Sequence, residues 1–238
     1  MLNNRNIIKK FGVIETKSKD EYIRQLISQG ENQHLDFKFE ISDSRKIARS
    51  LVAFANTDGG ILLVGVKDNG VIAGVRSEEE YYMVEAAASL FCAPEIKFNT
   101  HEYNIQGKSV LKISINKSLI VKHKAPDKNN EMKYYVRVDD QNLLAHPVQL
   151  IVWKLQQQKE HTQFCIKENE RSILEYLIIH PKVHYTLLIN DLKISKFKTN
   201  QILAHLIYYK LLKFKLLEKD ILFHLNENIT DIEEIQFS

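Results

Sequence analysis

The sequence predicts an α+β fold: a mixed sheet with flanking helices, followed by an all-α or winged-helix C-terminal domain. Apolar and polar residues alternate over residues 34–40, which indicates a half-buried strand. A stretch with helical spacing of apolar residues follows, and then an apolar strand at 61–66. Beyond about residue 169 the pattern changes to short amphipathic helices and one hairpin. This change divides the chain into two expected domains, residues 1–160 and 161–238.

Local signals set the predicted limits of the elements in the first domain. Gly30 ends the first helix, and Ser42 or Asp43 can cap the second one. Lys67–Gly70 predicts a hairpin turn, because Asn-Gly readily adopts the positive φ angles that such a turn requires. Ser77, with Glu80 three residues later, has the spacing of a capping box. In chain order we expect helices at 20–29, 43–55, 77–91 and 147–159, and strands at 34–40, 61–66, 71–75, 95–104, 108–115 and 134–138.

The second domain is predicted to contain three helices and a hairpin. Leucine and isoleucine recur at helical spacing near residues 173–178, 187–192 and 199–207. Two short apolar strands, 214–217 and 221–225, flank a tight turn. This is the order of elements in a winged helix-turn-helix domain, although a small helical cap could share it.

Composition limits the function classes without selecting a partner. The chain has 238 residues, of which 44% are hydrophobic and 26% charged, and its net charge is only +3. These values predict a globular protein, and a nucleic-acid partner would require a local basic face. The two cysteines lie far apart, which argues against a disulfide scaffold and a thiolate zinc site. No apolar run is long enough to cross a membrane and no signal-peptide core is evident, so the expected location is the cytoplasm.

Three carboxylates are the first candidate site. Glu31 precedes the first strand, Asp36 lies on its polar face, and Asp68 follows the apolar strand at 61–66. If the two strands are adjacent, these oxygens could hold Mg²⁺ or Mn²⁺, which can activate water against a phosphodiester. The alternative is structural: Glu31 ends a helix, Asp36 faces solvent, and Asp68 forms a turn.

The glycine pair in the 56–60 segment, Asn-Thr-Asp-Gly-Gly, is not expected to bind phosphate. Phosphate loops run from a strand to a helix N-terminus, whereas here a helix precedes a strand. A helix C-terminus closed by glycine is the better interpretation.

Two groups of polar and basic residues are candidates for nucleic-acid contacts. One lies in each domain, where such residues neutralise phosphates, and the group in the first domain could instead be a solvated helix face. The apolar residues between the C-terminal lysines also suit a dimer-forming surface. The first group is Lys38, Arg45, Lys46, Arg49 and Arg137, and the second is Lys196, Lys198, Asn200 and Gln201.

Several short motifs in register resemble the Schlafen-type AlbA domain family. They are Glu31 followed by Asp-Phe-Lys at 36–38, Ala-Phe-Ala-Asn-Thr-Asp-Gly-Gly at 53–60, Gly-Val-Lys-Asp at 65–68 and Tyr-Val-Arg at 135–137. The resemblance covers roughly residues 20–150, and Asp36 stands where the family pattern has glutamate. It implies an α+β nucleic-acid-binding domain, and bacterial members often continue into a helix-turn-helix segment.

The resemblance leaves three functions open. The first is a nucleic-acid-binding protein, in particular a DNA-binding transcriptional regulator that acts as a homodimer. The second is an Mg²⁺- or Mn²⁺-dependent endoribonuclease acting on structured RNA such as tRNA, since the matching carboxylates of animal Schlafens form such a site. Carried over, these carboxylates are Glu31, Asp36 and Asp68. The third is an interaction module whose C-terminal region only dimerises.

Overall fold

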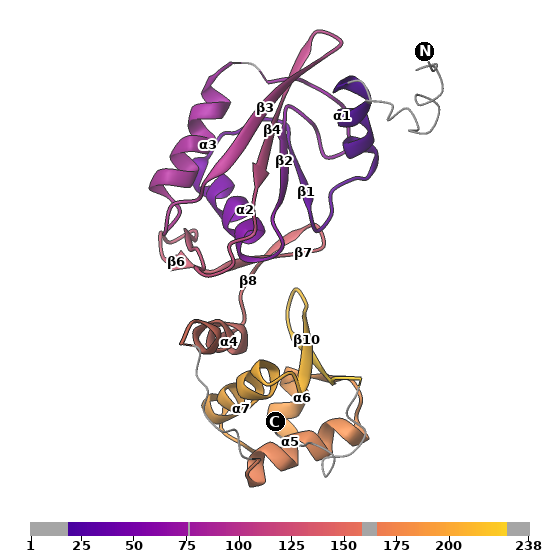
Figure 1. The fold of residues 1–238 in the computed structure, drawn as a ribbon, viewed down its shortest axis with the longest axis vertical. Coiled ribbons are helices and arrows are strands. Elements are labelled where there is room, and N and C mark those ends of the chain that lie inside the picture. The colour runs from indigo at the N-terminus through magenta and orange to yellow at the C-terminus, as the bar shows by residue number, and fades with distance from the viewer. Residues whose placement is uncertain (1–18, 76, 159–165, 228–238) are drawn as a thin grey trace, which may run out of the picture.

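The fold was analysed in a computed structural model, which describes residues 19–75, 77–158 and 166–227. The N-terminal part is an α+β unit built on a four-stranded mixed sheet, as predicted (Figure 1). Its elements, in chain order, are α1 (Lys19–Ser28), β1 (Leu35–Lys38), α2 (Ser44–Asn56), β2 (Gly60–Val64), α3 (Glu79–Leu90), β3 (Phe98–Ile105), β4 (Lys108–Ile115), β5 (Ala125–Pro126), β6 (Met132–Lys133), β7 (Tyr135–Val138) and β8 (Gln141–Leu144).

The strand order of the main sheet is β1-β2-β4-β3. β1 and β2 are parallel, with Asp36 opposite Leu62, and the other neighbours are antiparallel. Strands β3 and β4 form a hairpin whose two-residue turn, Gln106-Gly107, has positive φ at both residues. The short pairs β5-β6 and β7-β8 lie outside this sheet.

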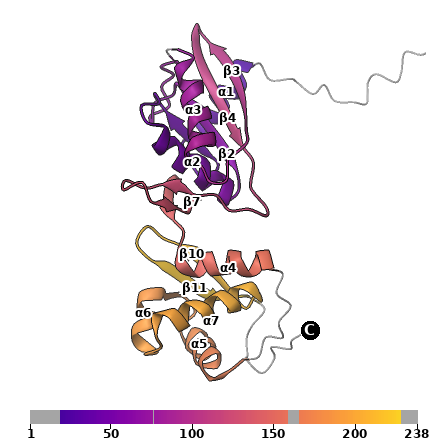
Figure 2. The same ribbon diagram turned by 90° about the vertical axis from the view of Figure 1, so that its left-hand side faces the viewer.

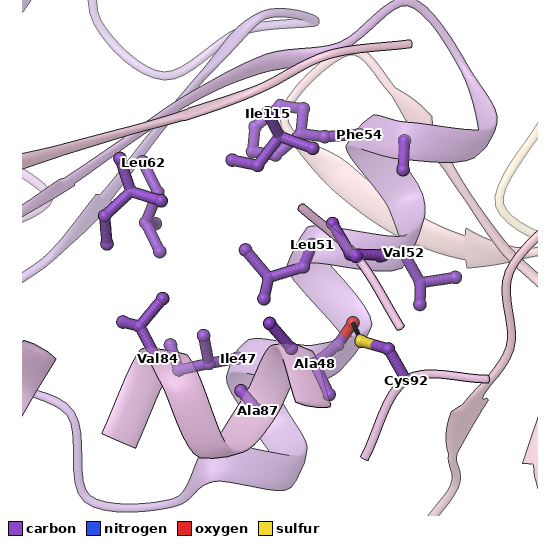
Figure 3. Packing of buried hydrophobic residues seen from close by; sticks show 14 of the residues in the cluster. Ile47, Ala48, Leu51, Val52, Phe54, Leu62, Val84, Ala87, Cys92 and Ile115 are labelled. Atoms are coloured by element: carbon purple, nitrogen blue, oxygen red, sulfur yellow. Dashed lines mark hydrogen bonds between the residues drawn. The ribbon is translucent and has the colours of Figure 1, made fainter. Parts of the chain in front are cut away.

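Two apolar clusters cover the two faces of the sheet. One face packs on α1 through Ile23, together with Leu35 and Phe37 of β1. The opposite face packs on α2 and α3, and Figure 3 shows the side chains between them. Leu51 and Phe54 of α2 are completely buried there, so burial of this helix contributes on the order of 2 kcal/mol for each large side chain.

Capping residues fix where α2 begins, as the sequence predicted. The Asp43 side chain accepts a hydrogen bond from the backbone N–H of Arg45. At the other end Gly59, with φ +74°, donates its N–H to the carbonyl of Phe54 and closes the helix. A Cβ on Gly60 would come within 2.3 Å of the Phe54 ring, so the glycine pair serves close packing.

The predicted strand at 71–75 is wrong. The turn at Lys67–Gly70 forms, with the Gly70 N–H donating to the Lys67 carbonyl at 2.7 Å. After it, only the single bridge between Val66 and Ile72 remains. The N–H groups of both Ala73 and Gly74 donate to the carbonyl of Gly65, so the chain folds over the end of β2 and does not continue a ladder.

The C-terminal part contains helices and a three-stranded sheet of order β10-β11-β9 (Figure 2). Its elements are α4 (Pro147–Gln158), α5 (Glu168–Ile179), β9 (Val183–His184), α6 (Tyr185–Asp191), α7 (Lys196–Tyr208), β10 (Leu212–Leu216) and β11 (Ile221–Leu225). A single apolar cluster joins them. Within the described residues, no helix is long and apolar enough to cross a bilayer.

Helix α4 contributes its buried side chains to this second cluster. Val148, Val152 and Leu155 pack there, together with residues of α5 and α7. The sequence pattern had grouped this helix with the N-terminal elements, because the boundary was placed at the polar residues that end the helix near residue 159. The division of the chain at residue 160 stays a prediction.

Candidate functional site

The segment that begins at Glu31 forms hydrogen bonds with the backbone groups along the outer edge of β1, and this edge is called sealed below. The Phe37 N–H donates to Glu31 Oε1 at 2.8 Å, and Lys38 Nζ donates to the Phe37 carbonyl at 2.7 Å. The Leu35 N–H donates to the carbonyl of Asn32. Among the strands of the described residues, β1 pairs with β2 alone, so these contacts satisfy the backbone groups that point away from the sheet.

Asp36 lies on β1 between two cations. It is only 4% exposed, and its Oδ2 lies 2.9 Å from Lys38 Nζ. Its Oδ1 lies 3.4 Å from Arg137 Nη2. The sequence predicted a solvated or metal-binding carboxylate at this position, whereas the structure makes it the centre of a buried ion-pair network.

Arg137 is the partner that holds this network to β7. Its Nε donates to the carbonyl of Asn32, its Nη2 to the carbonyl of Leu35, and its Nη1 to Asn142 Oδ1, over 3.1–3.2 Å. It is 2% exposed, and its donors are used inside the domain, so the structure contradicts the prediction that Arg137 contacts nucleic acid. A guanidinium suits this internal role, because its planar group of five N–H donors reaches several acceptors at once.

Glu31 and Asp36 titrate together because their carboxyl groups share a hydrogen bond. Partial burial, and then the hydrogen bond with Asp36, raise the pKa of Glu31 from an ordinary 4.5 to about 7. Burial alone would raise the pKa of Asp36, but the hydrogen bond from Glu31 and the charges of Lys38 and Arg137 lower it below 3.8. The pair therefore holds a proton on Glu31 and a charge on Asp36 over much of the acidic range.

Asp68 does not join these two carboxylates. It is exposed in the turn after β2. No group of three histidine, cysteine or acidic side chains in the described ranges is placed to hold a metal ion. The oxygens of Asp36 are engaged by Lys38 and Arg137, and Glu31 Oε1 is engaged by a backbone N–H. This arrangement does not fit the metal that the resemblance implies.

The predicted basic residues of α2 lie on its outer side. Arg45 and Lys46 are exposed, and Arg49 is half-buried. The Arg45 guanidinium lies over the Phe91 ring, 5.6 Å from its centroid, and Arg49 Nε donates to the Arg45 carbonyl. Contact of these side chains and of half-buried Lys38 with nucleic acid stays a prediction.

The predicted C-terminal residues separate into two groups. Lys196 and Lys198 are exposed at the start of α7, and Gln201 is half-buried one turn later. Asn200 is buried, and its Oδ1 accepts a 2.6 Å hydrogen bond from the hydroxyl of Tyr185. The prediction that Asn200 contacts nucleic acid is therefore wrong, because its acceptor is used inside the domain.

Two residues of the Asn-Thr-Asp-Gly-Gly segment have roles that sequence reasoning missed. Asn56 is buried, donates to the carbonyls of His123 and Tyr135, and accepts from the His123 N–H. The Thr57 hydroxyl accepts from the Arg137 N–H at 2.9 Å. The sequence feature that could have indicated these roles is the polar pair at the end of an apolar helix. Polar groups that are buried at such a position need hydrogen-bond partners elsewhere in the fold.

The fold and this network define an α+β domain with a sealed sheet edge, followed by a smaller unit of helices and a three-stranded sheet. Residues 31–146 match the family model described as Schlafen, AlbA_2. This part of the chain belongs to the Schlafen AlbA_2 domain family, as the motifs indicated. Among curated proteins, none matches the chain.

Two solved structures are similar to part of the chain. One is the DIP2311 protein from Corynebacterium diphtheriae, with 17% identity and a TM-score of 0.42, covering 60% of this chain and 33% of that one. The other is the N-terminal domain of a protein related to the ATP-dependent DNA helicase RecG, from Nitrosomonas europaea. It has 17% identity and a TM-score of 0.34, covering 61% of this chain and 94% of that one. The chain thus spans about a third of the DIP2311 structure.

Proposed function

We propose that this protein binds nucleic acid, and that it is a DNA-binding transcriptional regulator which uses its AlbA_2 domain and a C-terminal winged helix. The order α5-β9-α6-α7-β10-β11 carries the proposal, because it is the order of a winged helix-turn-helix domain. In that arrangement α7 is the recognition helix, and the β10-β11 hairpin is the wing beside it.

The side chains of α7 support this assignment. Its buried residues include Ile202, Leu203 and Leu206, which face the apolar cluster. Lys198, Gln201 and His205 recur at helical spacing on the side that these residues leave open. Exposed lysines at the start of the helix and on the hairpin would neutralise phosphates on either side of a groove.

The AlbA_2 domain would supply a second contact. Arg45 and Lys46 are exposed on α2, and Lys38 lies at the end of β1 with its side chain 34% exposed. Cations on two units of one chain would contact more phosphates than either unit alone, and each contact steepens the salt dependence of binding.

The test is a binding titration of the full chain with duplex DNA and with tRNA at several salt concentrations. We expect a logarithmic salt slope that is reduced by about 2 in a Lys196→Glu/Lys198→Glu variant, since each lost phosphate contact removes about 0.9. Lys128→Glu is the matched control, because Lys128 is an exposed lysine in the loop between β5 and β6. An unchanged slope in the α7 variant contradicts the assignment of α7, and no binding at low salt leaves the dimerising-module alternative.

The alternative function is an Mg²⁺- or Mn²⁺-dependent endoribonuclease. One observation favours it: Glu31 and Asp36 share a hydrogen bond beside Lys38. Against it stand the exposed Asp68 and the internal pairing of Asp36. Incubation with tRNA in Mn²⁺ or in chelator decides the matter. Metal-dependent cleavage that Asp68→Ala abolishes would overturn the binding-only proposal, and binding without cleavage would exclude the nuclease.

A further inference from the structure

The two edges of the main sheet differ in whether their outward backbone groups are hydrogen-bonded. At β1, side chains and a neighbouring carbonyl occupy the outward backbone groups of Leu35 and Phe37. At the other end of the sheet lies β3, which pairs with β4 along all eight of its residues (Figure 1). Within the described residues, no hydrogen bond reaches the outer backbone edge of β3.

The residues of β3 also lack the features that usually protect an edge strand. The strand Phe98–Ile105 contains no proline, glycine or lysine, and Glu102 is its only acidic residue. The run Asn99–Glu102 is exposed. Long edge strands are normally shortened, charged or covered, because their free N–H and C=O groups recruit another strand. An eight-residue edge with one acidic residue, and with no proline, glycine or lysine, is suited to pairing.

We propose that β3 is a dimerisation edge, which pairs antiparallel with β3 of a second copy of this chain. The two four-stranded sheets would then form one continuous sheet across a two-fold axis. A second copy is the occupant because β3 complements its own sequence. When two copies of β3 lie antiparallel, Thr100 of each can face Glu102 of the other. This inference concerns assembly and does not rest on the proposed nucleic-acid binding.

The β3-β4 turn determines which groups of β3 point outward. Gln106 and Gly107 have φ of 53° and 79°, as a two-residue type I′ turn requires. The residues that flank such a turn, Ile105 and Lys108, exchange both of their backbone hydrogen bonds. The bonding direction alternates along a strand. The even-numbered residues Phe98, Thr100, Glu102 and Asn104 therefore direct their N–H and C=O groups away from β4.

Symmetry and charge then select the register. An antiparallel pair across a two-fold axis places one residue of β3 opposite its own copy. Seven residues of each strand stay paired only when this central residue is His101 or Glu102. Centring on Glu102 opposes two carboxylates, which is destabilising. Centring on His101 opposes two imidazole rings and avoids this contact between carboxylates. It also places Thr100 of each copy opposite Glu102 of the other, where a hydroxyl can donate to a carboxylate.

The surroundings of β3 provide contact area beyond the strands themselves. A hollow of about 680 Å³ lies beside β3 on its α3 side, and Tyr81 and Tyr82 of α3 form one wall. Both tyrosines are exposed, Tyr82 by 58%. In the selected register Thr100 and Glu102 of the second copy enter this side, where the tyrosine rings can cover them. Aromatic residues are enriched in the centres of such interfaces.

Sedimentation of the full chain over a range of concentrations tests the dimer. Thr100→Pro removes an outward N–H without removing a bond to β4, so the monomer stays folded. We expect a dimer for the natural chain, and a dissociation constant at least about tenfold higher for Thr100→Pro, because pairing bonds are lost on both copies. Thr100→Ala, which retains the N–H, is the matched control. A natural chain that is monomeric throughout, or a dimer that Thr100→Pro leaves unchanged, overturns the proposal.

Cysteine cross-linking tests the register independently of the proline variant. In a Cys165→Ser background, His101→Cys should form an intermolecular disulfide under mild oxidation, because residue 101 faces its own copy across a pair without backbone bonds. Glu102→Cys, one residue further on the same strand, should not cross-link. Buried Cys92 should not interfere, since burial raises the pKa of its thiol to about 12. Cross-linking at residue 102 alone, or at neither position, contradicts the proposed interface.

Discussion

Replacing Arg137 by methionine should destabilise the AlbA_2 domain far more than the loss of an ordinary surface arginine. The Arg137 side chain is buried and pairs with Asp36, whose side chain is only 5% exposed. Methionine retains much of the aliphatic length and removes all of the donors. Asp36 would keep Lys38, but the carbonyls of Asn32 and Leu35 would each lose a donor.

The magnitude follows from the buried ion pair. Removing one member of such a pair costs about 3–5 kcal/mol, because a buried charge is left uncompensated. Lys38 remains 2.9 Å from Asp36 and supports its charge, which places the expected loss near the lower value, about 3 kcal/mol. For a chain of this size, each kcal/mol lowers the melting temperature by about 2–4 °C, so we expect a decrease of roughly 6–12 °C.

Calorimetry of the full chain measures this change, and hydrogen exchange of the β1 amides locates it. Arg49→Met is the matched control on α2 and should cost less than about 0.5 kcal/mol. A double variant, Asp36→Leu/Arg137→Met, should regain most of the lost stability, because it buries no unpaired charge. Equal effects of Arg137→Met and Arg49→Met, or a double variant no more stable than Arg137→Met, would refute the network as described.

Two further changes test other parts of the same domain. Glu31 has a raised pKa in the folded state, so its contribution to stability is complete below about pH 4.5 and is lost as pH rises through about 7. Glu31→Gln keeps the acceptor for the Phe37 N–H but does not titrate. Denaturant titrations should therefore show a smaller loss of stability between these pH values in the variant than in the natural chain. The same pH dependence of stability in both proteins would contradict the coupling of Glu31 to Asp36. Gly60→Ala should cost about 1–3 kcal/mol by thermal unfolding, because its Cβ would overlap the Phe54 ring. Gly60 does not have a positive φ, so its loss reports the overlap alone, whereas Gly107→Ala, which meets no atom within 4 Å, reports the cost of positive φ.

Patterns of neighbouring residues were sufficient to predict most of the elements. The alternation around Phe37 gave β1, and the Asp43 cap gave the start of α2, since both signals depend only on local backbone geometry. The return strand after Gly70 could not be predicted, because the Gly65 carbonyl accepts two N–H groups only when the chain has folded over β2.

The site was harder to predict, because its partners are far apart in the sequence. Asp36 and Arg137 are separated by 101 positions, and nothing near Arg137 indicates that its charge turns inward. The alternation of Tyr135, Val136 and Arg137 is equally consistent with a solvated strand. The prediction for Asn200 failed for the same reason. A polar residue on a basic helix gives no indication that its side chain accepts a hydrogen bond from the buried Tyr185 hydroxyl.

The structure gives the Glu31–Lys38 motif a role that needs no catalysis. Glu31 and Lys38 occupy the outward backbone groups of β1, and Asp36 holds Arg137, which occupies another. Variants at these positions would therefore change stability as well as function, and cannot by themselves separate a nuclease from a binding protein. Asp68 is exposed and outside this network, so Asp68→Ala should change stability by no more than about 0.5 kcal/mol. Loss of an activity in that variant would report chemistry, because the sheet edge would remain sealed.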